Sequence, residues 1–219
     1  MLIMKNNFLL LIILSIVFYA CSQSEESVNE FKSSIAYIDY CKSDIITPDD
    51  YIQWVDAKFS KQVNYGNVIY ELKYIPVEYK LLKNSKYKSI EAFNKDVKEF
   101  SNSQYFTFRI SVKDYSGNPI KYNLVSENEY YARVEYLSFG ILNDICLIEN
   151  EDSLFCKLNN FERSYNLDPY ITESFSFDKV DTTSNGDKVF IYNDRLFGNG
   201  IIKFRFSNKE LNNSPKIGF

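Results

Sequence analysis

The stretch "YFTFRISV", residues 105–112, decides the fold that we expect for this chain. Its apolar residues alternate strictly with polar ones, which is the period of a β-strand with one buried face. The side chains predicted to point into the core are those of Phe106, Phe108, Ile110 and Val112. The turn residues Gly117, Asn118 and Pro119 follow closely. The stretch therefore predicts a half-buried strand at the start of a β-rich region.

Downstream, the chain continues as short apolar segments separated by turn residues. Turn signals stand at "SNGD", residues 184–187, and at "GNG", residues 198–200. Short strands at this spacing are typical of a β-sandwich or a strongly curled sheet. The further strands that we predict span residues 131–139, 144–149, 153–159, 173–180, 188–193 and 200–206.

Upstream, the pattern predicts two helices with a strand between them. Thr47 can cap a helix and Pro48 suits its first turn, so we predict a helix over residues 48–60. Alternation in "VIYELKY", residues 68–74, predicts a half-buried strand. Residues 89–101 return to the helical period and predict a second helix.

These patterns together predict a mainly β, α+β fold with two helices. Residues 35–103 have the order helix–strand–helix, and residues 104–219 form an antiparallel, β-sandwich-like region. We expect both regions to belong to a single globular domain over residues 35–219, because a chain of this length can bury one core.

Composition limits the chemistry that the chain can perform. Aromatic residues make up 17% of it, which suits a β-rich core, and the net charge is −4 with no basic block that stands out. Nucleic acid is therefore not an expected partner. The chain has no histidine, which excludes Ser-His-Asp and Cys-His catalysis and His-based zinc or haem ligation in their usual forms. We expect no metal and no cofactor.

The chain has four cysteines: Cys21, Cys41, Cys146 and Cys156. The segment "CLIENEDSLFC", residues 146–156, has the pattern of a hairpin in which Leu147 would face Phe155. In that hairpin Cys146 and Cys156 would lie opposite each other and could form a disulfide in an oxidising compartment. The alternative is two buried free thiols.

An apolar run near the start of the chain, "LLLIILSIVFYAC" at residues 9–21, ends on a cysteine. Lys5 is the only charge before it, and its apolar core is 13 residues long from Phe8 to Ala20. A membrane-spanning helix needs about 20 apolar residues. A charged start, a short apolar core and a small residue before a cut describe a secretory signal, so we predict that residues 1–20 are a signal peptide.

The end of this run, "FYAC" at residues 18–21, resembles the lipobox of bacterial lipoproteins. In that family the signal is cut before the cysteine, and its thiol carries a lipid. The resemblance implies that Cys21 anchors the chain to a membrane, and Ser22 in place of Asp favours the outer membrane. Residues 21–34 are polar and predict a flexible tether. The alternative is an ordinary signal peptide with a chance cysteine near its end.

A second resemblance covers most of residues 50–217. Segments such as "YFTFRISV" and "LFGNGIIKFRF" resemble parts of uncharacterised lipoproteins of Bacteroidota. "CSQSEE", residues 21–26, resembles the acidic export tag of surface lipoproteins in the same group. The resemblance implies a cell-envelope protein that faces the periplasm or the cell surface, and it brings no activity with it.

Paired carboxylates, as in glycosidases, are the remaining catalytic option for a chain without histidine. The candidate groups are Glu127 with Glu129, the cluster of Glu149, Glu151 and Asp152, and Glu162 with Asp168. Most of them lie in predicted turns, where acidic residues usually face solvent only. We therefore assign no catalytic residue.

The sequence favours a lipid-anchored envelope protein that acts as a non-enzymatic binding or assembly module. It would reach the membrane through Cys21 and contact an envelope protein or polysaccharide through edge strands or an aromatic surface patch. The alternative is a hydrolase that uses paired carboxylates on an envelope polysaccharide. A purely structural or immunity role is a third possibility, which the sequence does not separate from the first.

Overall fold

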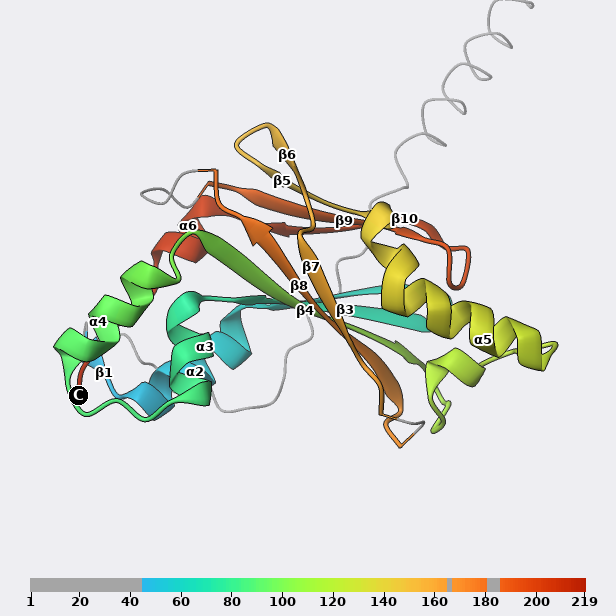
Figure 1. Ribbon diagram of the computed structural model, residues 1–219, viewed down its shortest axis with the longest axis horizontal. Coiled ribbons are helices and arrows are strands. Elements are labelled where there is room, and N and C mark those ends of the chain that lie inside the picture. Colours follow the sequence, from blue (N-terminus) through green and yellow to red (C-terminus); the bar gives the residue numbers. More distant parts are fainter. Residues whose placement is uncertain (1–44, 165–166, 181–185) are drawn as a thin grey trace, which may run out of the picture. The chain divides into compact units, whose positions relative to one another are not determined.

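The computed structural model describes residues 45–164, 167–180 and 186–219 (Figure 1). All of them belong to one compact unit, Tyr37–Phe219. The predicted signal peptide, the whole of the predicted tether and both Cys21 and Cys41 lie outside the described residues.

Two antiparallel sheets form the centre of the described unit. The five-stranded sheet has the order β2 (Ser60–Tyr65), β3 (Val68–Ile75), β4 (Ser103–Val112), β8 (Tyr170–Asp178) and β7 (Leu158–Glu162). The four-stranded sheet has the order β10 (Gly200–Phe206), β9 (Lys188–Asp194), β5 (Ile145–Glu149) and β6 (Asp152–Phe155). A short parallel pair, β1 (Ile45–Ile46) with β11 (Lys216–Ile217), lies at one end.

Aromatic rings from the two sheets pack against each other and make the core. The ring centroids of Phe108 and Tyr192 are 5.2 Å apart, and those of Phe106 and Phe190 are 5.5 Å apart. The four inward side chains predicted in residues 105–112 are all buried. The described residues thus confirm the prediction of a mainly β, α+β fold with a sandwich-like arrangement of antiparallel sheets.

The helices of the N-terminal half follow the predicted pattern, with one addition. Helix α2 (Pro48–Lys58) begins after Thr47, whose hydroxyl accepts a hydrogen bond from the Asp50 amide at 3.2 Å. Helix α4 (Ile90–Glu99) lies within the second predicted helix. Helix α3 (Val77–Asn84) was not predicted. It begins directly after Pro76, because proline is tolerated at the start of a helix and cannot extend the β3 ladder.

The predicted strand over residues 131–139 is wrong. The chain there forms helix α5 (Glu127–Glu135), a π-helical turn η2 (Tyr136–Gly140) and a 3₁₀ turn η3 (Ile141–Asp144). The buried side chains of Leu137 and Ile141 are four residues apart, so the apolar period is helical.

The predicted strand over residues 153–159 is two strands that belong to different sheets. β6 pairs with β5, and β7 pairs with β8. The chain crosses from one sheet to the other at Cys156 and Lys157, so the pairing cannot continue through these residues. The strands predicted over 144–149, 173–180, 188–193 and 200–206 are confirmed as β5, β8, β9 and β10.

The predicted pairing inside the β5–β6 hairpin is wrong by one residue. Cys146 lies opposite Phe155, and Leu147 lies opposite Leu154. The cause is a tight two-residue turn at Asn150 and Glu151, both with positive φ, where a longer turn was expected. Cys146 and Cys156 consequently do not face each other, and both are free thiols in the structure.

Candidate binding groove

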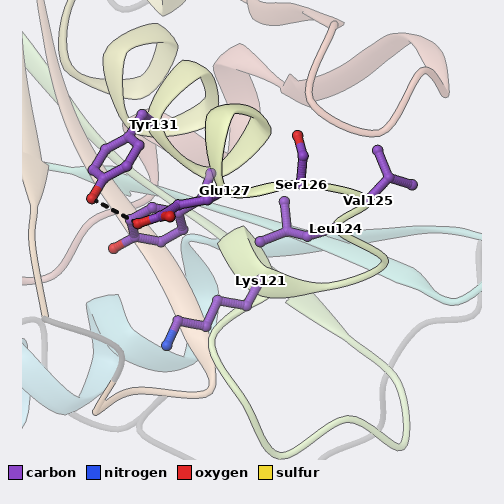
Figure 2. A pocket seen from close by; sticks show the side chains of 7 residues that line it. Lys121, Leu124, Val125, Ser126, Glu127 and Tyr131 are labelled. Atoms are coloured by element: carbon purple, nitrogen blue, oxygen red, sulfur yellow. Dashed lines mark hydrogen bonds between the residues drawn. The ribbon is translucent and has the colours of Figure 1, made fainter.

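An open groove of about 630 Å³ lies beside the N-terminus of α5 (Figure 2). Two of its residues expose large apolar side chains: Val125 is 89% exposed and Tyr131 is 59% exposed. Exposed apolar and aromatic side chains beside polar groups make this open hollow a candidate contact surface. The lining residues are Lys121, Leu124, Val125, Ser126, Glu127, Tyr130 and Tyr131.

A reciprocal cap fixes the start of α5 at the rim of this groove. The Ser126 hydroxyl accepts a hydrogen bond from the Glu129 amide at 3.2 Å. The Glu129 carboxylate in turn accepts a hydrogen bond from the Val125 amide at 3.0 Å. This is close to a capping box, which satisfies amides that the first helical turn leaves unpaired.

Arg133 holds the groove wall that precedes α5. Its Nη1 atom donates to the carbonyl oxygens of Ile120 at 3.0 Å and of Tyr122 at 2.8 Å. Its Nη2 atom donates to Glu129 at 2.6 Å. Because a guanidinium group is planar, these three bonds set the geometry of the segment around the 3₁₀ turn η1 (Pro119–Lys121).

Asn118 fastens the same segment to the five-stranded sheet. Its Nδ2 atom donates to the carbonyl oxygens of Asp168 at 3.2 Å and Tyr170 at 3.3 Å, and its Oδ1 atom accepts from the Ile120 amide at 3.0 Å. Asn118 is 4% exposed, so these bonds are protected from water. The groove is therefore largely organised before any ligand arrives, which lowers the entropic cost of binding.

The polar groups in the groove are few and of mixed charge. The Tyr131 hydroxyl donates to Glu127 Oε1 at 3.2 Å, the contact drawn as a dashed line in Figure 2. Within the described ranges, no carboxylate lies at ion-pair distance from Lys121. The groove thus offers one cation, one anion and aromatic surface for recognition.

Glu127 and Glu129, the first predicted acidic pair, do not line the same groove. The two residues are two positions apart on α5, so they do not share a face. Glu127 lines the groove, whereas Glu129 contacts Arg133. The Val125 amide and then the Arg133 guanidinium lower the pKa of Glu129, so it stays ionised and is unsuited to be a general acid.

The structure separates the predicted cluster of Glu149, Glu151 and Asp152. Glu149 is 1% exposed and forms a buried ion pair with Lys188, which is fully buried. Glu149 also accepts a hydrogen bond from Gln104 Nε2 at 2.8 Å. Glu151 is exposed in the hairpin turn, and Asp152 is exposed at the start of β6. Burial lowers the pKa of Lys188, and the Glu149 carboxylate opposes that effect.

The third predicted pair consists of Glu162, at the end of β7, and Asp168, on the connection from β7 to β8. Glu162 is exposed at the end of β7 and lines a small hollow with Arg163 and Ser164. Asp168 is half-buried, and its backbone carbonyl accepts the hydrogen bond from Asn118. The hollow therefore contains one member of the pair, Glu162.

Sequence reasoning missed Glu173, a carboxyl group in the core. It is 0% exposed, and its Oε2 atom accepts a hydrogen bond from Asn159 Nδ2 at 3.3 Å. In the described part of the chain, its Oε1 atom has no hydrogen-bond partner. Burial raises the pKa of Glu173 to about 8. The signal was the alternation of "YITESFSF", which puts Glu173 on the inward face with Ile171 and Phe175.

Across the described ranges, no group of three or more Cys, Asp or Glu side chains is placed to hold a metal ion. No helix in the described part of the chain is long and apolar enough to cross a membrane. Comparisons with protein-family models, curated proteins and solved structures gave no match.

Proposed function

We propose that this chain is a lipid-anchored protein of the cell envelope whose β-sandwich domain binds an envelope protein or polysaccharide through the groove at α5. The observation that carries the proposal is the groove itself. Its walls are held by Arg133 and Asn118, and its surface exposes Val125 and Tyr131. Rigid aromatic and apolar surface with few charges favours recognition of a partner.

The distribution of carboxylates supports binding over hydrolysis. Two-acid hydrolysis of a glycoside needs two carboxyl groups about 5–10 Å apart on either side of the substrate. Glu127 is the single carboxylate among the residues that line the groove. Glu149 and Glu173 are both buried within the core, where a polysaccharide could not reach them.

The location rests on the start of the chain. "FYAC" at residues 18–21 and the polar residues that follow it support lipid attachment at Cys21 and a tether between the membrane and the domain. Two or more acyl chains give stable anchoring, because each buried CH₂ contributes about 0.8 kcal/mol. The outer membrane is the compartment that Ser22 favours.

Site-specific photo-crosslinking in intact cells tests the groove. A photoreactive residue replaces Val125, and a matched control replaces Phe155, which is 80% exposed on β6 and outside the groove. We expect a discrete protein or glycan adduct from position 125 and none of the same mass from position 155. In the protein with the photoreactive residue at position 125, the additional substitution Tyr131→Ala should reduce that adduct several-fold. Equal adducts at both positions, or none at position 125, would overturn the proposal.

A further inference from the structure

The second half of α3 and its connection to α4, residues 80–88, concentrate positive charge in an acidic protein. Four lysines and no acidic residue stand between Tyr79 and Ile90, although the chain has a net charge of −4. We call residues 80–88 the lysine loop; its lysines are Lys80, Lys83, Lys86 and Lys88. Sequence reasoning passed over it because other residues separate the lysines, so that no uninterrupted basic run appears.

The charges of the lysine loop face solvent. Lys83, Lys86 and Lys88 are exposed, and no carboxylate in the described ranges lies at ion-pair distance from them. Lys80 lies over the ring of Tyr105, 3.4 Å from its centroid. The neighbouring helix α4 contains three acidic residues and two lysines, and one of the acids, Asp96, accepts a hydrogen bond from Tyr87 at 2.8 Å.

The exposed ring of Phe219 lies close to the lysine loop. Its centroid is 6.4 Å from that of Tyr87, which stands between Lys86 and Lys88 in the sequence. Phe219 is 49% exposed and also packs against Phe93 at 5.3 Å. Exposed aromatic surface beside lysines is the combination by which proteins bind the interface of a bilayer.

The first described strand lies at the same end of the unit. β1 pairs with β11, and the Gly218 amide donates to the Ile46 carbonyl at 2.9 Å (Figure 1). Ile45, the first residue that the structure describes, therefore lies at the same end of the unit as Phe219.

We propose that the lysine loop and Phe219 dock on a membrane surface that contains anionic lipid headgroups. The biological setting rests on the proposed anchor at Cys21, whereas the surface itself rests on charge complementarity and exposure. Each lysine near such a surface strengthens binding about fivefold. Salt screens this interaction, so the lysines alone would hold the domain only weakly. Their proposed role is to orient the domain on the membrane that the lipid on Cys21 would already hold it to.

Vesicle co-sedimentation of a chain without lipid tests this surface. Residues 21–219 with Cys21→Ser are mixed with phosphatidylcholine vesicles with or without phosphatidylglycerol at low salt. We expect binding only when phosphatidylglycerol is present. Lys83→Gln, Lys86→Gln and Lys88→Gln together should weaken it roughly a hundredfold, about fivefold for each lysine.

A charge-matched variant is the control for net charge. It changes three exposed lysines outside both the lysine loop and the groove, Lys113, Lys157 and Lys203, to Gln, and it should bind almost as well as the parent. Equal loss in both variants, binding to neutral vesicles, or binding to soluble dextran sulfate but to no vesicle would overturn the proposal. Lipid attachment at Cys21 is tested separately, by the mass of the mature N-terminus. The outcome for the lysine loop therefore does not depend on the outcome for the anchor.

Discussion

Glu173 places a carboxyl group with one unpaired oxygen in the core of the described residues. Its carboxyl group shares the inner face of the five-stranded sheet with aromatic side chains, and Asn159 is its hydrogen-bond donor. Asn159 also donates to the carbonyl of Leu137 in the π-helical turn η2 at 3.1 Å. The acid is therefore linked through one amide to the segment that follows α5.

We expect the stability of the protein to depend on the ionisation of Glu173. Its pKa rises from the ordinary value of 4.5 to about 8 on folding, so the folded state holds a proton that the unfolded state releases between these values. The free energy of unfolding should therefore fall as pH rises through this window and level off above it. The slope should be at most about 1.4 kcal/mol per pH unit.

Urea unfolding of the parent and of Glu173→Gln near pH 5 and near pH 8 measures this effect. Glutamine keeps the shape and the neutral state of the protonated acid, so the variant should lose less stability across the window than the parent does. An identical pH dependence in the two proteins would show that Glu173 is already ionised in the fold.

At the scale of elements, Arg133 joins α5 to the segment that precedes it. The expected effect of Arg133→Met is a loss of about 1.5–3 kcal/mol, since hydrogen bonds to a charged group are among the stronger ones. Amide hydrogen exchange of residues 119–126 should become faster by more than the loss of global stability accounts for. Urea unfolding and exchange mass spectrometry give both quantities.

Arg205→Met provides the matched comparison for Arg133. Arg205 pairs with Asp187 at 2.6 Å, but its side chain is 72% exposed, and such surface pairs contribute at most about 1 kcal/mol. If the two substitutions cost the same and residues 119–126 exchange at the parental rate, Arg133 does not organise the groove.

Most elements with a local signal were predictable, whereas the groove, which depends on contacts between separate segments, was not. β3, β4, α2 and α4 follow from residue period and capping alone. Helix α5 was missed although Ser126 and Glu129 carry the spacing of a helix cap. The groove could not be predicted, because it depends on Arg133 reaching back to the carbonyls of Ile120 and Tyr122.

At the scale of the described molecule, carboxylates lie in two kinds of environment. Glu149 and Glu173 are buried in the sandwich, whereas the exposed acids of the described residues are spread over α2, α4, α5 and several loops. In the account proposed above, the groove meets a partner and the lysine loop meets the membrane.

Mass spectrometry of the N-terminal peptide of the protein, purified from the membrane fraction of its own cells, tests the proposed anchoring most directly. We predict a peptide that begins at Cys21 and carries diacylglyceryl on its thiol. A mature peptide that still contains residues 1–20, or one in which Cys21 is unmodified, would contradict lipid anchoring.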